Sequence, residues 1–217
     1  MRGFLQKDME LLKQSRSFIG IVIVMTIFMV CIKNESFIII YLGMMGGFLT
    51  MSTISYDEAD HGMGFLMTLP ASRRVYAIEK YILGYGVSFT FLLAGVVISS
   101  LTDLLRGIAM EPGEWFLTVE TGILIVALFM VVLVPVQLKF GADNGRIVMA
   151  AVFLSCFGLV YLMIKITESL GTDTEQLLQD VLNLGAPVIT LVTAIFLIAV
   201  SCISCRISIH IMERKEF

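Results

Sequence analysis

Six long apolar runs constrain the fold more than any other feature of the chain. They cover residues 17–32, 36–55, 81–101, 122–138, 147–166 and 186–205. A helix that crosses a bilayer needs about 20 apolar residues, and about 17 can suffice. Backbone groups in lipid must bond within their own segment, so each run is expected to be a helix. Composition agrees, because 58% of the residues are hydrophobic and 15% are charged. The sequence therefore predicts an all-α, polytopic membrane protein with six transmembrane helices in a single domain, residues 1–217.

The basic residues predict the orientation of these spans. If both termini are cytoplasmic, only three of the fifteen basic residues face outward, namely Lys33, Arg106 and Lys165. The other twelve face the cytoplasm: Arg2, Lys7, Lys13, Arg16, Arg73, Arg74, Lys80, Lys139, Arg146, Arg206, Arg214 and Lys215. Cytoplasmic loops of membrane proteins carry an excess of Lys and Arg. We therefore expect both termini to be cytoplasmic.

Two segments outside the runs are expected to form short helices at the membrane surface. Residues 1–16 place Phe4, Leu5, Met9 and Leu12 on one helical face and Lys7, Asp8 and Lys13 elsewhere. This pattern predicts an interfacial amphipathic helix, with a short solvated helix as the alternative. The outer loop at 167–185 contains Thr172-x-x-Glu175, a capping-box pattern followed by an apolar stripe. It predicts a short extracellular helix.

The spans contain almost no ionisable residue, with Glu79 and Lys80 at the inner mouth of the third span. Ionisable groups inside spans usually mark ion or proton pathways. Because the spans have almost none, neither a proton relay nor catalysis within the membrane is expected. Cys202-x-x-Cys205 could be a redox or metal pair, but no second ligand pair is nearby and two small residues near a helix end explain it better. Pro135 is expected to kink the fourth span, either as a hinge or only as a bend. No metal site and no cofactor are predicted.

The longest cytoplasmic loop, 56–80, begins with the letters D-E-A-D at 57–60. In a helicase, those letters require a phosphate-binding loop of the form G-x-x-x-x-G-K-[ST]. The chain has no such loop, so neither ATP nor nucleic acid is expected to bind here. If the protein works with ATP, another chain must bind it, and this chain is not expected to be an enzyme.

The order of residues in this loop suggests a docking segment. Three carboxylates in "DEADHG" precede the apolar stretch "GFLMTL", and "ASRRVYAIEKY" then begins a helix. A short apolar helix between acidic and basic flanks suits docking into a groove on another protein. A solvated loop whose helical turn lies on the lipid surface is the alternative.

The stretch "TLPASRRVYAIEKYILG" resembles a signature of the permease subunits of type 2 ABC exporters, with matching residues at Leu69, Pro70, Ser72, Arg73 and Lys80. Within that family, the chain is most similar to small bacterial peptide-exporter permeases, including those that export phenol-soluble modulins. The resemblance implies a bacterial plasma-membrane protein with a cytoplasmic ATPase partner and a second permease subunit, identical or related. It also implies that the loop at 56–80 is the coupling helix.

The candidate coupling residues are Asp57, Glu58, Phe65, Leu66, Leu69, Pro70, Ser72 and Arg73. Phe65, Leu66 and Leu69 are the expected apolar anchors. Asp57 and Glu58 are expected to pair with basic residues of the ATPase or of this chain's own cytoplasmic edge. Arg73 is expected to pair with an acidic groove wall or with these carboxylates.

The low charge of the spans favours a hydrophobic or amphipathic substrate, such as a peptide or a lipid-like molecule, over an ion. We expect it to enter from the cytoplasm or the inner leaflet and to leave along a pathway between two permease subunits, with membrane lipid as a further partner. Two other functions remain open from sequence. One is a substrate-binding membrane subunit of a vitamin-uptake ABC system. The other is a membrane sensor or immunity protein that binds a peptide without transporting it.

Overall fold

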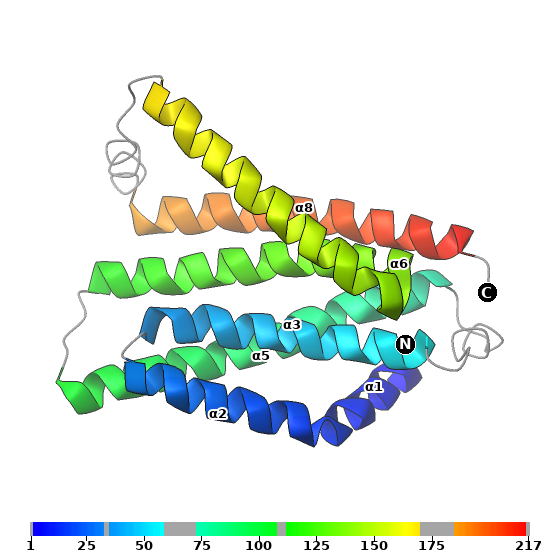
Figure 1. Cartoon of the computed structure of the whole chain (residues 1–217), viewed down its shortest axis with the longest axis horizontal. Coiled ribbons are helices and arrows are strands. Elements are labelled where there is room, and N and C mark those ends of the chain that lie inside the picture. Colours follow the sequence, from blue (N-terminus) through cyan, green and yellow to red (C-terminus); the bar gives the residue numbers. More distant parts are fainter. Residues whose placement is uncertain (1, 33–34, 59–72, 108–111, 170–184, 216–217) are drawn as a thin grey trace.

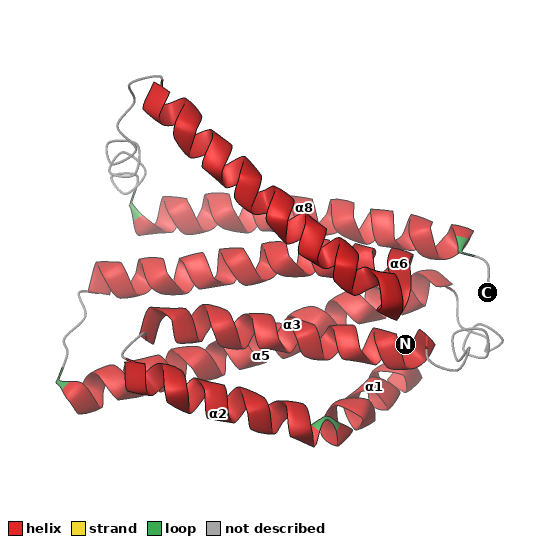
Figure 2. Cartoon of the chain, viewed as in Figure 1, coloured by secondary structure: helices red, strands yellow, loops and turns green. Residues whose placement is uncertain are grey.

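Six helices make up nearly all of the described chain (Figures 1 and 2). The computed structural model describes residues 2–32, 35–58, 73–107, 112–169 and 185–215. The helices are α1 (Arg2–Gln14), α2 (Arg16–Ile32), α3 (Glu35–Glu58), α5 (Arg73–Arg106), α6 (Pro112–Ser169) and α8 (Ala186–Arg214). No strand occurs in these ranges, and the all-α prediction is confirmed for them.

Four of the described helices are long and apolar enough to cross a membrane: Phe37–Glu58, Arg73–Arg106, Trp115–Gly141 and Ala186–Arg214. A fifth candidate arises if α1 and α2, which meet at 61°, count as one bent span. The predicted run at 147–166 is helical, within α6, but is not among these candidates. Six spans therefore stay a prediction.

α3 lies at the centre of the bundle and α8 at its margin. In the most apolar window of each helix, 56% of α3 is buried but only 6% of α8. α3 packs against α5 and α6, and α8 packs against α6 and α5 (Figure 1). The start of α1, the end of α3, the start of α5 and the end of α8 lie at the same end of the bundle (Figure 1).

A glycine allows α3 and α5 to approach closely. A Cβ atom placed on Gly46 would lie 2.6 Å from the backbone Cα of Ser88 on α5. Backbone cannot yield as a flexible side chain can, so only glycine fits there. Small residues serve this purpose in membrane helix pairs generally.

Hydroxyl groups join α5 to α8. Tyr81 Oη lies 2.6 Å from Ser204 Oγ and 2.9 Å from Ser208 Oγ, and Tyr85 Oη lies 2.7 Å from Ser201 Oγ. Interhelical hydrogen bonds of this kind help to hold membrane helices together. They fix the register of α8, which buries little apolar surface.

The buried face of α1 differs from the predicted one. Phe4 and Asp8 are buried, whereas Met9 is exposed. Phe4, Asp8 and Leu12 repeat at intervals of four residues and therefore share one face of a helix. The sequence interpretation that placed Asp8 away from the apolar face was wrong, because Asp8 meets a buried cation.

The main break in α6 falls at Gly141 rather than at Pro135. Gly141 has φ 73° and ψ −171°, whereas Pro135 lies inside continuous helix. Glycine adopts positive φ without steric cost, so it suits the position where the chain reverses direction. A functional hinge at Pro135 stays a prediction.

Cys31, Cys202 and Cys205 carry free thiols.

Candidate functional site at the ends of α3 and α5

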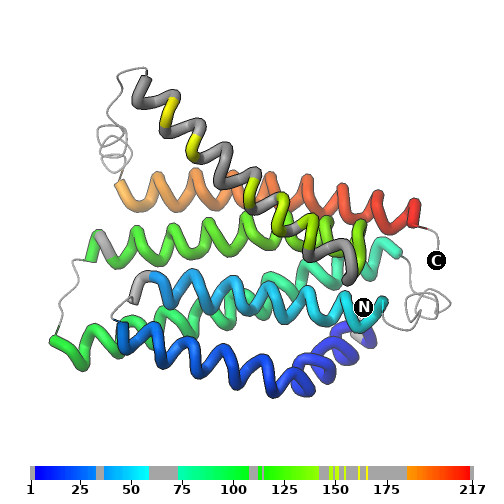
Figure 3. Tube along the Cα trace, in the orientation of Figure 1, coloured from blue at the N-terminus to red at the C-terminus, as the bar shows by residue number. Residues whose placement is uncertain are grey.

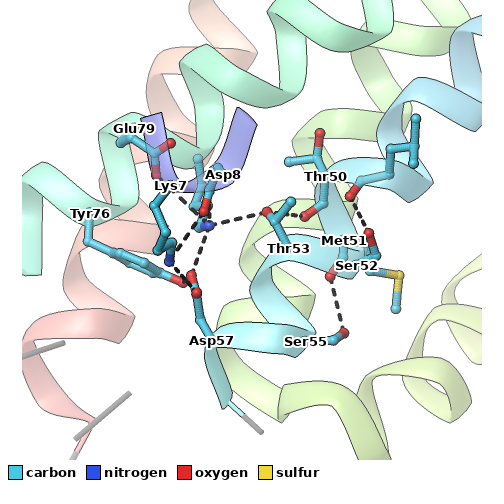
Figure 4. Close-up of polar contacts among 12 residues, drawn as sticks. Lys7, Asp8, Thr50, Met51, Ser52, Thr53, Ser55, Asp57, Tyr76 and Glu79 are labelled. Carbon is cyan, nitrogen blue, oxygen red and sulfur yellow. Dashed lines mark hydrogen bonds and ion pairs between the residues drawn. The ribbon is translucent and has the colours of Figure 1, made fainter. Parts of the chain in front are cut away.

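A buried charge cluster joins α1, α3 and α5 (Figure 4). Lys80 of α5 has no solvent exposure, and its Nζ forms an ion pair with Asp8 of α1. The same Nζ lies 2.9 Å from Asp57 Oδ2 of α3 and donates a hydrogen bond of 3.2 Å to Thr53 Oγ1. One ammonium group therefore bridges three helices.

Lys7 provides a second cation at the edge of the cluster. Its Nζ pairs with Asp57 Oδ1 and lies 3.2 Å from Asp8 Oδ1. The Lys7 side chain is 31% exposed, whereas those of Asp8 and Lys80 are fully buried. Each aspartate thus faces both lysines, and the cluster reaches solvent through Lys7.

Tyr76 completes the cluster on the α5 side. Its hydroxyl donates a 2.8 Å hydrogen bond to Asp57 Oδ2, and its ring lies 5.0 Å from Lys80 Nζ. Phe4 of α1 packs edge-on against this ring, with 5.9 Å between centroids. A cation near an aromatic face gains electrostatic energy, so Tyr76 supports both the aspartate and the lysine.

Glu79 is the member of the cluster whose charge is least compensated. It is fully buried, and neither carboxylate oxygen has a hydrogen-bond partner among the described residues. Its nearest cation is Lys80, 4.0 Å away and already paired with two aspartates. Three acids therefore share two lysines, and Glu79 is the acid with the weakest compensation.

A second group of contacts ties the adjoining helix ends to α6 and α8. Lys215 Nζ lies 2.6 Å from Glu58 Oε1 and donates a 3.0 Å hydrogen bond to the Leu138 carbonyl. Arg73 Nη1 donates to the carbonyls of Met212, Glu213 and Lys215 at 2.9–3.3 Å. A basic side chain in this position satisfies carbonyl groups that a helix end leaves open.

The structure brings together three of the eight sequence-predicted coupling residues. Asp57, Glu58 and Arg73 lie at the two helix ends that flank residues 59–72. Asp57 pairs with Lys7 and Lys80, and Glu58 pairs with Lys215, so these carboxylates meet basic residues of this chain's own edge. Arg73 donates to backbone carbonyls of the α8 end, and its expected pairing with a carboxylate stays a prediction. Phe65, Leu66, Leu69, Pro70 and Ser72 lie outside the described residues.

Sequence reasoning missed Lys7, Asp8 and Tyr76 as members of the site. The four-residue spacing of Phe4 and Asp8 was the available signal, because it puts a carboxylate on the face that α1 buries. Within the described residues, no group of three or more His, Cys, Asp and Glu side chains could hold a metal ion. The arrangement joins α1, α3 and α5 through buried ion pairs.

The family profile described as "ABC-2 family transporter protein" matches residues 3–213. No curated protein and no solved structure is significantly similar to the chain. The match extends over α1, both ends of the segment between α3 and α5, and most of α8. The chain belongs to the ABC-2 family of membrane transporter proteins.

Proposed function

We propose that this chain is the membrane-spanning permease subunit of an ATP-driven exporter, and that residues 59–72 dock a separate ATPase chain. Membership of the ABC-2 transporter family supports a permease subunit with an ATPase partner. It favours this reading over the vitamin-uptake alternative. We further propose six spans with cytoplasmic termini and assembly with a second permease subunit in a bacterial plasma membrane.

The buried charge cluster is the observation that best supports coupling. Its members Asp57 and Lys80 stand on opposite sides of residues 59–72, on α3 and α5. Asp8 adds α1 to the same cluster. A displacement of the docking segment would therefore act on three helices together, since no single helix end can move without separating buried charges.

The outer contacts extend this connection to the remaining helices. Glu58 is joined to Lys215, and Arg73 is joined to the carbonyl end of α8. The Glu58 carboxylate also lies against Gly141, where α6 breaks: a Cβ atom there would be 2.7 Å from Glu58 Oε2. Closure of an ATPase pair would thus rock α3, α5, α6 and α8 as one body. The low charge of the spans suits a hydrophobic or amphipathic substrate, and we propose a peptide.

Replacing the apolar anchors tests the docking proposal. Phe65→Ala with Leu69→Ala is expected to remove ATPase co-purification and transport, because each buried apolar side chain contributes about 1.5–3 kcal/mol and a few anchors carry most interface energy. The purified variant should insert and remain folded. The measurements are ATP hydrolysis, co-purification of the ATPase chain and peptide efflux.

Leu104→Ala with Leu105→Ala is the matched control. Both leucines are exposed at the opposite end of α5, so this pair should keep the ATPase and the transport. Normal ATPase binding and efflux in the Phe65/Leu69 variant would show that residues 59–72 are only a connector. Deletion of the chain's gene should abolish peptide efflux, and efflux that persists after the deletion would instead favour a sensor or immunity protein.

A further inference from the structure

A continuous apolar groove runs between α2 and α5. Its inner part has a volume of about 420 Å³ and lies beneath α1, between Leu5, Leu12 and Leu83. Its outer part has a volume of about 470 Å³ and lies between Val22, Ile27 and Ile98. Ile19, Thr90 and Phe91 line both parts. α2 follows one margin of the bundle (Figure 3), and the groove is the space it leaves beside α5.

The groove wall offers no free hydroxyl to an occupant, and the thiol of Cys31 is only a weak donor. Its only hydroxyls belong to Thr26 and Thr90. Thr26 Oγ1 donates to the Val22 carbonyl at 2.7 Å, and Thr90 Oγ1 donates to the Gly86 carbonyl at 2.7 Å. A peptide backbone placed here would leave its own polar groups unpaired, which is costly. The buried part of the occupant must therefore be hydrocarbon.

The two ends of the groove differ. At the outer end, the Arg106 guanidinium donates to the Val30 carbonyl and joins α5 to α2. At the inner end, α1 and α2 meet, and Arg16 begins α2 with an exposed side chain. Arg16 precedes Ile19 by three residues and Ile23 by seven, so it shares a helix face with the groove lining. No acidic side chain of the described chain forms an ion pair with it.

We propose that this groove binds one acyl chain of an anionic phospholipid, with the phosphate of the head group held by Arg16. Lys13 is nearby but already pairs with Glu10 at 2.7 Å, so Arg16 carries the head-group preference. The positive charge of Arg16 matches the anionic head group of such a lipid, and the apolar wall matches its acyl chain. A lipid without net charge matches only the apolar wall.

Fluorescence quenching by brominated lipids tests this site. Trp115 is the only tryptophan, so Trp115→Phe with Phe91→Trp places one reporter in the groove wall. The full chain is reconstituted in phosphatidylcholine vesicles with equal fractions of brominated phosphatidylglycerol or brominated phosphatidylcholine. Quenching should be stronger and saturate earlier with phosphatidylglycerol. Arg16→Gln should reduce this preference roughly fivefold, since one basic residue contributes about 1 kcal/mol, and Arg16→Lys should keep most of it.

Phe196→Trp on the exposed face of α8 is the matched control and should be quenched equally by both lipids. Ile27→Trp, also in the groove wall, replaces Phe91→Trp if that variant does not fold. Equal quenching of the groove reporter by both lipids would overturn the proposal, because it would show unselective lipid contact. Absence of quenching by either lipid would also overturn it, because a second copy or another protein would then cover the groove.

Discussion

Lys80 holds two aspartates from different helices, and it does so without solvent exposure. Removing one partner of a buried ion pair leaves an uncompensated charge and costs about 3–5 kcal/mol. Lys80→Met is therefore expected to destabilise the chain strongly, with a large fall in thermal unfolding temperature in detergent. It should also expose α1 to protease, because Asp8 loses its main partner.

Arg74→Met is the control for this change. Arg74 is the exposed basic residue in the same stretch of α5, and surface charges contribute little. Its unfolding temperature should match that of the unchanged chain. Equal stability of the Lys80 and Arg74 variants would mean that the charge cluster does not hold α1, α3 and α5 together.

Glu79 should respond in the opposite way to Lys80. Its buried carboxylate accepts no hydrogen bond among the described residues. The cost of removing its charge from water is therefore offset by little stabilising interaction. Glu79→Gln is expected to leave stability unchanged or raise it slightly, whereas Asp57→Asn should lower it. Asp57 loses more, because it accepts from Tyr76 and pairs with both lysines. Thermal unfolding of both variants side by side checks the order, and a larger loss for Glu79→Gln contradicts it.

The sequence alone could single out residues that flank the loop, but it could not identify partners that lie far along the chain. Asp57, Glu58 and Arg73 were identified because they flank an unusual loop. Several of their partners, namely Lys7, Lys215 and the α8 carbonyls, lie 50 to 157 residues away. Nothing in a single sequence states such pairings. The sequence also predicted few charges in the spans. In the structure, the charged residues of the cluster lie on α1, near the end of α3 and near the start of α5.

At the scale of helices, the contact between α3 and α5 depends on Gly46. A methyl group there would lie 2.6 Å from the Ser88 backbone, so Gly46→Ala must push the helices apart. Overpacking of this kind costs about 1–3 kcal/mol. Gly86→Ala is the matched control, because nothing lies within 4 Å of a Cβ atom at Gly86. Gly46→Ala should unfold at a lower temperature than Gly86→Ala, and equal values would show that α3 and α5 can separate freely.

Apolar periodicity predicted that helices exist but not where they end. The third apolar run was placed at 81–101, with a helix expected to begin before it in "ASRRVYAIEKY", and α5 extends over Arg73–Arg106. The first two turns of α5 carry Tyr76, Glu79 and Lys80, which are polar and so do not register as membrane span. In the structure they are helical and buried. The predicted loop at 56–80 is correspondingly shortened, since α3 continues to Glu58 and α5 begins at Arg73.

For the whole molecule, the arrangement of helix ends agrees with the charge asymmetry of the sequence. The start of α1, the junction of α3 with α5, and the end of α8 share one end of the bundle (Figure 1). Basic residues Lys7, Arg73 and Lys215 lie there, and Arg106 lies at the opposite end of α5. Loops with an excess of Lys and Arg remain in the cytoplasm. From this charge bias we propose that the end of the bundle with Lys7, Arg73 and Lys215 faces the cytoplasm.

Cysteine labelling in intact cells tests the orientation. In a chain whose four native cysteines are replaced by serine or alanine, Glu175→Cys should react with an impermeant maleimide from outside. His61→Cys should react only after permeabilisation, because it follows the end of α3 at the basic end of the bundle. The unlabelled cysteine-free chain controls for background, and peptide efflux shows that each variant is assembled. Labelling of position 61 from outside and protection of position 175 would invert the molecule. An ATPase in the cytoplasm could then not reach residues 59–72, and the coupling role proposed for that segment would be lost together with the orientation.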